Sequence, residues 1–398
     1  MRKILFLAAL ALLVVIALAV VSTASAATTF PQPTKQWTVM VYIAGDNSLE
    51  TYVTKDIDTE LSALGSNANV NVVCLADRGY KNDSADGGWT STKLFYCTQG
   101  MTAIPANAVA DWGERDMGDP QTLKDFVSWT KSNCPATNYL LAFWDHGYMW
   151  FPNYYTMRDE TSGGDSLNDD EQIAAMQTVG GVGVVAWDCC QRQMLEMALD
   201  WQPYAQAMAG SEQYTNWEGI QYDQVISAIR TTPTMTPQQV SDKIAQTALG
   251  DSITYSSLAL DTRMTTLKTA VDQWAIALQA GLPTYKSAYS SALRNTQFFT
   301  EASEKDLYDA AFQIKAKVAD ANIKAKCDAV MSAVTAAVTV NWTNGSSKVA
   351  GAHGIAIWFP NSATQLKGIV QGDFAYYQAH EALATSTHWD EFLAAFCQ

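Results

Sequence analysis

Two residues of this 398-residue chain have the types and positions expected for nucleophilic catalysis. Cys190 follows an apolar run that ends at Trp187, and a helical pattern begins a few residues later. A thiol between a strand and a helix meets unpaired backbone N–H groups, which favour the reactive thiolate. His146 follows an apolar run that ends at Trp144, and an imidazole transfers protons readily near neutral pH. Either residue alone is weak evidence, since a lone cysteine is more often inert and a loop histidine often has no role.

These residues would be positioned by apolar segments that alternate with helical patterns. Predicted buried strands, rich in β-branched and aromatic residues, cover 36–45, 70–76, 93–97, 138–144, 184–187, 206–211 and 354–359. Apolar residues at helical spacing cover 49–64, 122–132, 194–198 and 389–396. Asp46, Asn47 and Ser48 offer side-chain caps for the first helix. The alternation predicts an α/β fold, a mostly parallel sheet flanked by helices, with His146 and Cys190 at the carboxyl ends of strands where active sites lie.

The chain begins with the layout of a secretory signal peptide. Arg2 and Lys3 form a short basic start, residues 4–21 are apolar, and Ala24 and Ala26 supply an A-x-A cleavage site. The alternative is an uncleaved membrane anchor, since the apolar run approaches the length that spans a bilayer. We expect a signal peptide over residues 1–26, a secreted or extracytoplasmic protein, and no membrane contact once the signal is removed.

Composition divides the rest of the chain into four predicted parts. Residues 27–36 form a linker, and residues 37–233 carry the strand–helix alternation of a catalytic core. Residues 234–338 are rich in alanine, lysine, glutamine and threonine, which predicts a mainly helical insertion. Residues 339–398 return to the core, with a strand pattern that ends at Pro360.

Charge and cysteine content bear on the class of partner. The chain has 25 Lys and Arg against 40 Asp and Glu, a formal charge of −15, which argues against nucleic acid as a partner. An acidic surface suits a basic peptide or a cation. The seven cysteines form no C-x-x-C pair and the chain has four histidines, so no structural zinc site is expected. The odd number of cysteines leaves at least one unpaired.

Seven stretches of the chain resemble, in the same order, the clostripain family of cysteine peptidases, whose fold is caspase-like. They are WTVMVYIAGDNSLE (37–50), MGDPQTLKDFVSW (117–129), YLLAFWDHG (139–147), DETSGGDSL (159–167), WDCCQRQMLE (187–196), AGSE (209–212) and GIAIWFP (354–360). The ordered set is far more specific than any single stretch. The resemblance implies that Cys190 is the nucleophile, that His146 protonates the leaving amine, and that the backbone N–H groups of Gly147 and Cys190 bind the oxyanion.

The nucleophile motif departs from the family pattern at two points. The family motif resembles D-A-C-L-M followed by a downstream Glu, so Asp188 and Glu196 take the two acidic positions. Cys189 stands where the family has a small residue, which leaves open which cysteine attacks. Gln191 and Arg192 replace the apolar pair, and the added charge could alter helix packing or specificity.

The resemblance also implies a pocket for a basic side chain. Asp188 resembles the acidic floor of an S1 pocket, which selects Arg or Lys because a buried carboxylate needs a cationic partner. The alternative role of Asp188 is to cap the next helix. Glu212 and Glu218 follow the next strand and could contribute to the same pocket.

Arg158 is the one basic residue between Gly147 and Cys189. The resemblance implies a cut between the His and Cys motifs after a basic residue. We therefore hypothesise that Arg158 is a self-processing site and that cutting frees access to Cys190. The alternatives are an ion pair of Arg158 with an acidic neighbour and an enzyme that needs no cut.

No cofactor is expected, apart from calcium as an alternative at the acidic residues 165–171. Their spacing does not match an EF-hand loop, and Asn168 with Glu171 forms a capping box for a helix from Asp169, which is the favoured interpretation. The sequence thus predicts an exported cysteine endopeptidase that cleaves after Arg or Lys with a Cys–His dyad. Two alternatives stay open: an inactive exported binding protein of the same fold, and a transpeptidase that uses the same thioester.

Overall fold

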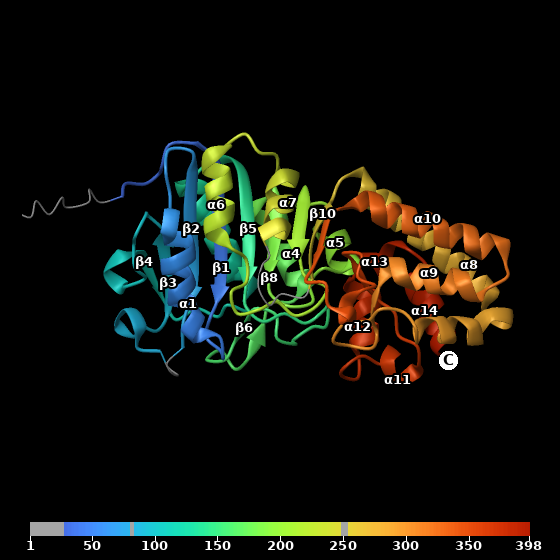
Figure 1. Cartoon of the computed structure of the whole chain (residues 1–398). Helices are drawn as coiled ribbons and strands as arrows, with labels where there is room; N and C mark the ends of the chain where they lie inside the picture. Colours follow the sequence, from blue (N-terminus) through green and yellow to red (C-terminus); the bar gives the residue numbers. More distant parts are fainter. Residues whose placement is uncertain (1–27, 80–82, 248–253) are drawn as a thin grey trace, which may run out of the picture. The chain divides into compact units, whose positions relative to one another are not determined.

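The computed structural model of the protein describes residues 28–79, 83–247 and 254–398 (Figure 1). The predicted signal peptide, residues 1–26, lies outside the described residues. Among the described residues, no helix is both long and apolar enough to cross a membrane. Residues Pro31–Gln398 belong to one unit, in which a central sheet is followed by a mainly helical region (Figure 1).

Nine strands of the described chain form one mixed sheet, in the order β12-β10-β9-β8-β5-β1-β2-β3-β4. They are β1 (Lys35–Ala44), β2 (Val70–Asp77), β3 (Thr92–Tyr96), β4 (Ala108–Gly113), β5 (Ala136–Trp144), β8 (Val184–Asp188), β9 (Ala207–Gly210), β10 (Thr254–Ala259) and β12 (Val338–Thr343). The central strands from β9 to β2 are parallel, and an antiparallel pair flanks them at each edge. The predicted α/β fold is confirmed, with the parallel pairing confined to the centre of the sheet.

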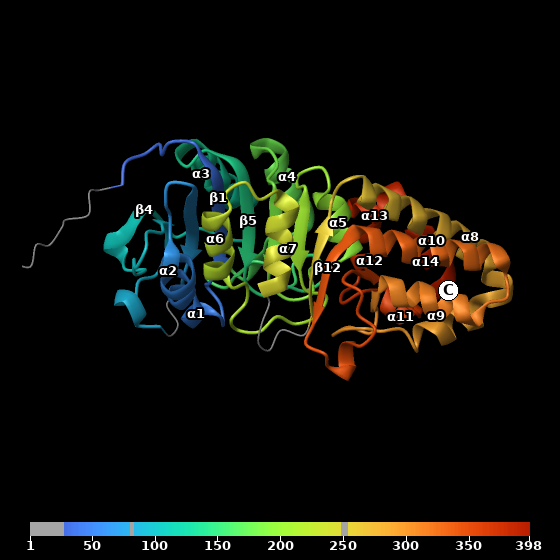
Figure 2. The ribbon, with the colours of Figure 1, turned by 45° about the horizontal axis from the view of Figure 1, so that its top comes forward.

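Helices cover both faces of this sheet because its central strands are apolar on both sides. The flanking helices are α1 (Glu50–Asp56), α3 (Pro120–Asn133), α4 (Asp169–Val179), α5 (Leu195–Trp201), α6 (Tyr222–Thr231) and α7 (Pro237–Thr247). Alternate residues of β1 point to opposite faces: Val41 belongs to the core cluster that includes Ile226 of α6, whereas the Tyr42 ring lies 6.1 Å from that of Phe126 in α3. Figures 1 and 2 show α6 and α7 on the same face.

The first predicted helix, over residues 49–64, is interrupted. It consists of α1, a π-helical turn (Ile57–Leu61) and α2 (Ser62–Leu64). Val53, Ile57 and Leu61 are all buried, so the apolar spacing still serves one packed face through the change in helical pitch. The predicted caps do not cap it, because α1 begins at Glu50 without a side-chain cap.

The helical region also contains a two-stranded sheet, formed by β11 and β13. The elements of the whole region are α8 (Thr262–Leu293), β11 (Glu304–Asp306), α9 (Leu307–Lys317), α10 (Ala321–Ala337), β13 (Ala356–Trp358), α11 (Ala363–Leu366), α12 (Asp373–His380), α13 (Ala382–Ser386) and α14 (Trp389–Cys397). The strand predicted at 354–359 is the shorter β13, which pairs with β11 rather than with the main sheet. The helix predicted at 389–396 is α14.

The predicted boundary of the helical insertion, at residue 234, lies too early in the chain, because two elements of the core follow it. α7 and β10 lie within the predicted range 234–338, yet β10 pairs with β9 in the main sheet. The apolar pattern does not predict β10, because this strand carries buried hydroxyls instead of a continuous apolar run. Ser257 Oγ lies 2.7 Å from Ser241 Oγ, and Ser256 Oγ donates to the Gly354 carbonyl at 2.6 Å. The mainly helical part begins only at α8.

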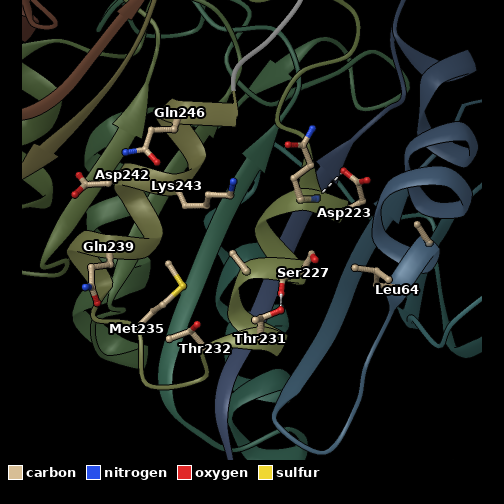
Figure 3. Close-up of a pocket in the computed structure, with 13 residues that line it drawn as sticks. Leu64, Asp223, Ser227, Thr231, Thr232, Met235, Gln239, Asp242, Lys243 and Gln246 are labelled. Atoms are coloured by element: carbon tan, nitrogen blue, oxygen red, sulfur yellow. Dashed lines mark hydrogen bonds between the residues drawn. The ribbon is translucent and has the colours of Figure 1, made fainter.

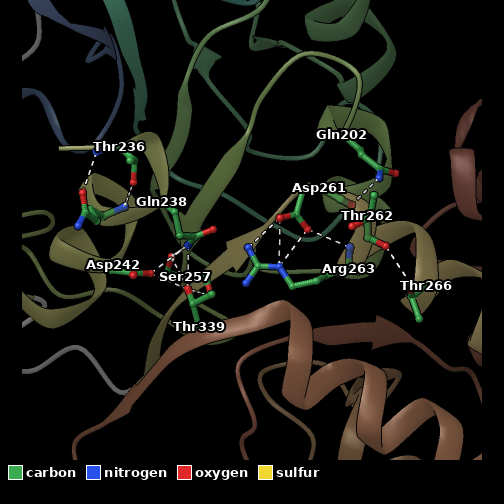
Figure 4. A network of polar contacts seen from close by, with 11 residues as sticks. Gln202, Thr236, Gln238, Asp242, Ser257, Asp261, Thr262, Arg263, Thr266 and Thr339 are labelled. Carbon is green, nitrogen blue, oxygen red and sulfur yellow. Dashed lines mark hydrogen bonds and ion pairs between the residues drawn. The ribbon is translucent and has the colours of Figure 1, made fainter. Parts of the chain in front are cut away.

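A polar network fastens the strand by which the chain returns from the helical region. Gln238 Nε2 in α7 donates to Ser257 Oγ of β10 at 2.9 Å and to Thr339 Oγ1 of β12 at 2.8 Å (Figure 4). Thr339 Oγ1 donates in turn to Asp242 Oδ1 at 2.5 Å. One helix thus holds the outgoing and returning strands together.

Arg192, the unexpected charge after the nucleophile motif, is a packing residue of the core. Its side chain is 1% exposed, forms an ion pair with Asp169 of α4, and donates to the Met149 carbonyl. The guanidinium also lies 4.6 Å from the centre of the Trp187 ring. The charge is therefore neutralised inside the protein and joins the turn after β8 to α4.

Removing one partner tests this buried ion pair. Asp169→Asn should lower the free energy of unfolding by about 3–5 kcal/mol, because the Arg192 guanidinium stays buried without a counter-charge. Urea denaturation followed by circular dichroism measures the change. As a control, Asp328→Asn removes the exposed partner of Lys315 and should cost less than about 1 kcal/mol. Equal losses in the two variants would contradict a structural role for the buried pair.

Candidate active site

The register between β5 and β8 brings the two predicted catalytic residues to one edge of the sheet. Trp144 and Asp188 are direct partners in these parallel strands, and His146 and Cys190 each follow two residues later. Both line one cavity of about 420 Å³. The geometry therefore places a thiol and an imidazole on the same solvent-accessible space.

Position 147 requires a glycine, because its backbone lies against the turn that carries Cys189 and Cys190. A Cβ at this position would lie 2.4 Å from the carbonyl oxygen of Cys190 and 3.0 Å from the Sγ of Cys189. Within the described chain, the backbone N–H groups of Gly147 and Cys190 donate to no other residue. Two N–H groups without partners fit the predicted oxyanion donors.

The two adjacent cysteines differ in access. Cys189 is fully buried, whereas Cys190 is half-buried and lines the cavity. The Cys190 Sγ accepts the N–H of Thr215 at 3.4 Å, and the Thr215 hydroxyl lies 3.7 Å away. Burial raises the pKa of the Cys190 thiol, and the Thr215 N–H opposes this rise. Access thus favours Cys190 as the nucleophile, with Thr215 as a donor that sequence reasoning missed.

His146 is held by the loop that follows β1. Its Nε2 lies 2.9 Å from Ser48 Oγ, so the hydroxyl predicted to cap α1 instead contacts the imidazole. Burial, with the nearby positive charge of Arg158, lowers the pKa of His146. The two shifts favour a neutral imidazole and a neutral thiol in the resting pair.

Asp188 lines the same cavity. It is 6% exposed, and its Oδ1 accepts the N–H of Ile220 at 2.9 Å. Its Oδ2 has no hydrogen-bond donor among the described residues. Burial raises the pKa of Asp188 to about 7, although the Ile220 N–H and the nearby Tyr222 hydroxyl oppose the rise. Asp188 does not cap the next helix, because α5 begins at Leu195.

Aromatic side chains line the same cavity. The rings of Tyr52 and Trp217 stack at 5.4 Å with their planes 15° apart, and the Trp217 side chain is 64% exposed. Gly219 has φ +54°, and a Cβ there would lie 2.2 Å from Asp188 Oδ1. Gly219 thus leaves room for the carboxyl of Asp188.

The other two acids predicted for this pocket lie elsewhere. Glu212 is buried outside the cavity, where its Oε2 accepts the N–H of Gly354 at 3.2 Å. Glu218 is exposed and does not line the cavity, although its neighbours on both sides do. The structure instead places Asp56 and Glu60 near Asp188. Burial raises the pKa of each of these two carboxyls to about 7.

Arg158 lies in a hydrogen-bonded segment rather than in an open loop. It begins β6 (Arg158–Asp159), which pairs with β7 (Asp165–Ser166). Its N–H donates to Asp145 Oδ2 at 2.5 Å, and its carbonyl accepts from Asn47 Nδ2 at 3.0 Å. Cleavage after Arg158 would first require this segment to open.

The acidic segment at 165–171 adopts the structure that the sequence favoured. Asn168 and Glu171 form the predicted capping box at the start of α4. Asp169 is engaged by Arg192 in the buried ion pair. In this segment, the Glu171 carboxylate therefore caps the start of α4, and the Asp169 carboxylate forms an ion pair in the core.

A larger cavity of about 850 Å³ lies elsewhere, along α6 and α7 (Figure 3). Its wall includes Asp223, Ser227, Asp242 and Lys243. None of the described residues that line it is a cysteine or a histidine. The chemistry of a nucleophile and a proton carrier is thus found in the smaller cavity.

Comparison with known proteins agrees with this fold. The pattern of the Clostripain family matches residues 41–396, and the chain belongs to this family. Clostripain of Hathewaya histolytica is 25% identical over 223 residues, which cover 48% of this chain and 42% of that protein. The chain thus matches less than half the length of that relative.

Two solved structures share the fold over most of the chain. A secreted C11 cysteine protease from Bacteroides thetaiotaomicron, in complex with an irreversible peptide inhibitor, gives a TM-score of 0.68 at 17% identity, covering 89% of this chain and 99% of that one. An inactive zymogen C11 protease from Parabacteroides distasonis gives 0.65 at 17% identity, covering 92% and 100%. These likenesses confirm the predicted caspase-like fold.

Labelling with an arginyl chloromethyl ketone should separate the two adjacent cysteines. We expect Cys190→Ala to lose labelling and peptidase activity, because no other described residue places a thiol in the cavity. Cys189→Ala should keep both while losing about 1–2 kcal/mol of stability from the core. Mass spectrometry of the labelled peptide measures the site. Labelling of Cys190→Ala at Cys189 would overturn the assignment.

Proposed function

We propose that this chain is an exported cysteine endopeptidase that cleaves peptides after Arg or Lys. One observation carries the proposal: Cys190 and His146 line a single cavity that the buried residue Asp188 also lines. Membership of the clostripain family supports the reaction class. The signal-peptide pattern of residues 1–26 supports export, and a neighbour of the same fold is described as secreted.

The reaction follows from the neutral resting pair. His146 accepts the proton of the Cys190 thiol as the sulfur attacks the scissile carbonyl, and the N–H groups of Gly147 and Cys190 stabilise the oxyanion. His146 then donates the proton to the leaving amine, which leaves a thioester on Cys190. Water attacks this thioester, gives a proton to His146, and releases the acid as the thiol is restored.

Specificity is set by charge and shape together. A side chain of Arg or Lys entering the cavity passes the Tyr52–Trp217 pair, where a cation is attracted to the aromatic faces. It then meets the Asp188 carboxyl, whose Oδ2 lacks a donor within the described chain. An entering cation stabilises the ionised form of Asp188 and so supplies the counter-charge that burial withholds.

The availability of the oxyanion donors favours a catalyst over an inactive binding protein of the same fold. The N–H groups of Gly147 and Cys190 have no other partner within the described chain. Product analysis with an added amine distinguishes the remaining alternative. A hydrolase releases the free acid in its presence, whereas a transpeptidase forms the amide.

Asp188→Asn should weaken cleavage after Arg far more than it harms folding. Removing one partner of a desolvated charge pair costs about 2–5 kcal/mol, so kcat/KM for an arginyl peptide should fall by at least about 30-fold. The measurement compares arginyl with citrullyl peptides, which have nearly the same shape without the charge. Glu218→Gln, which changes an exposed acid nearby, is the control and should leave the preference intact. An unchanged preference in Asp188→Asn would place the specificity acid elsewhere.

The preference for a cation should depend on pH. Because the pKa of Asp188 is raised to about 7, its carboxyl is largely neutral at pH 6 and ionised at pH 8. The ratio of kcat/KM for arginyl over citrullyl peptides should therefore rise by about tenfold from pH 6 to pH 8. The ratio cancels the titration of Cys190 and His146, which both substrates share. A flat ratio in the wild type would contradict the role of this carboxyl.

Self-processing after Arg158 is part of the same proposal. Because both peptide groups of Arg158 are hydrogen bonded, we expect cleavage to be slow and to accelerate when this segment is loosened. Asn47→Ala removes the donor to the Arg158 carbonyl and should increase the cut. Mass spectrometry of purified wild type, Asn47→Ala and Cys190→Ala detects a new terminus at Asp159. An active wild type that stays uncut would end this hypothesis.

A further inference from the structure

Residues 300–304, a short segment of the helical region that ends at the first residue of β11, contact all three loops of the candidate site. The loop after β5 carries His146, the turn after β8 carries Cys190, and the loop after β9 carries Thr215. Each loop makes one hydrogen bond between side chains to the segment. The three bonds run from the Tyr148 hydroxyl to Glu301 Oε1, from Gln191 Nε2 to Glu304 Oε2 at 2.6 Å, and from Thr300 Oγ1 to Gln213 Oε1 at 2.6 Å.

The bond from Gln191 to Glu304 acts directly beside the nucleophile. Both side chains are fully buried. Gln191 has φ +58°, a left-handed conformation that a residue with a side chain rarely adopts unless its contacts hold it there. Its backbone N–H donates to the Gln213 carbonyl at 3.2 Å, and its side chain donates to Glu304. These two bonds therefore fix the turn that carries the Cys190 sulfur.

Regular structure holds the segment in place. The Glu304 N–H donates to the Glu301 carbonyl at 2.9 Å and closes a turn, and Glu304 pairs with Trp358 of β13. The Ala356 N–H of β13 donates to the Gln193 carbonyl at 2.9 Å, in the stretch that follows the nucleophile turn. The segment is thus presented by a two-stranded sheet that is itself bonded to the chain just after the nucleophile, which is the kind of rigid support that a precise site needs.

We propose that residues 300–304 hold the Cys190 turn and the His146 loop at the spacing that the reaction needs, an inference that rests on the proposed peptidase function. None of the five residues lines the cavity, so they are positioning residues. Gln191, which stands where the family pattern has an apolar residue, has its polar partner in this segment. Because a small displacement of a reacting group lowers a rate severely, bonds this close to the sulfur affect the chemical step.

A matched pair of substitutions separates the hydrogen bond from the size of the side chain. Burial raises the pKa of Glu304 well above its usual range, although the Gln191 amide opposes the rise, and this favours the neutral carboxyl. Glu304→Gln keeps the shape, the neutral state and an acceptor for Gln191. Glu304→Met keeps the length of the side chain but removes the acceptor. We expect the first variant to behave as the wild type and the second to release the nucleophile turn.

The pH dependence of Cys190 alkylation by iodoacetamide tests the proposal, since this small reagent requires neither a substrate nor a specificity pocket. In Glu304→Met the apparent pKa of Cys190 should rise by about 0.5–1 pH unit, because a displaced sulfur loses the N–H of Thr215. Besides burial, the charges of Asp188 and Glu304 raise the pKa of Cys190, so a mere loss of charge would lower this pKa in both variants. His146 is unchanged in both. Mass spectrometry verifies the alkylated residue.

Steady-state kinetics on an arginyl peptide supplies the second measurement. In Glu304→Met, kcat should fall at least about tenfold while KM changes by less than about twofold, because the pocket around Asp188 is left intact. Asp390→Leu is the matched control. It breaks a bond of the same kind, from Gln378 Nε2 to Asp390 Oδ2 at 2.8 Å between α12 and α14, and should leave kcat and the alkylation profile unchanged.

Two further variants keep the proposal testable if Glu304→Met does not fold. Tyr148→Phe and Thr300→Val each remove one hydroxyl donor without changing shape, and each should lower kcat by about 2- to 10-fold. An unchanged alkylation profile in Glu304→Met, the same shift in Glu304→Gln or Asp390→Leu, or full kcat in both hydroxyl variants would overturn the proposal. A wild type that is alkylated at Cys190 but cleaves no arginyl peptide would instead overturn the proposed function, and the alkylation profiles would still decide this inference.

Discussion

The alignment of β5 with β8 is the constraint on which the candidate site depends. These neighbouring parallel strands pair Trp144 with Asp188, and each then gives way to a turn that carries one catalytic residue two positions later. A shift of one residue would turn every side chain of a strand to the opposite face. The buried rings fix this register, since Phe143 of β5 stacks on Trp187 of β8 at 4.9 Å. The same strand register therefore determines both the packing of the sheet and the geometry of the site.

Much of this arrangement could be predicted because buried parallel strands have a strong sequence signal. Continuous apolar runs located β1, β2, β5 and β8 to within one or two residues, and the positions just after these runs located His146 and Cys190. β10 was missed because its serine hydroxyls bond to Ser241 of α7 and to the Gly354 carbonyl, so a buried strand has a polar sequence. An apolar run in the sequence indicates a buried strand, but a buried strand whose hydroxyls are hydrogen bonded does not produce such a run.

The rest of the site could not be predicted from the sequence because it depends on contacts between distant segments. Thr215 reaches the Cys190 sulfur from the loop after β9, and Asp56 approaches Asp188 from the helix after β1. Asp188, Asp56 and Glu60 all have pKa values raised to about 7 mainly by burial, which no sequence pattern reports. The sequence showed Arg192 as an added charge near the nucleophile that could alter helix packing or specificity, and only the position of Asp169 explains why it can be buried.

The way in which the chain leaves and re-enters the sheet has an evolutionary consequence. Leu258 at the end of β10 pairs with Val338 at the start of β12, so the long segment between them begins and ends at adjacent points. Lengthening such a segment adds only a logarithmic entropy of closure. The helices between β10 and β12 can therefore gain, lose or exchange whole turns among relatives while the sheet edge keeps its geometry.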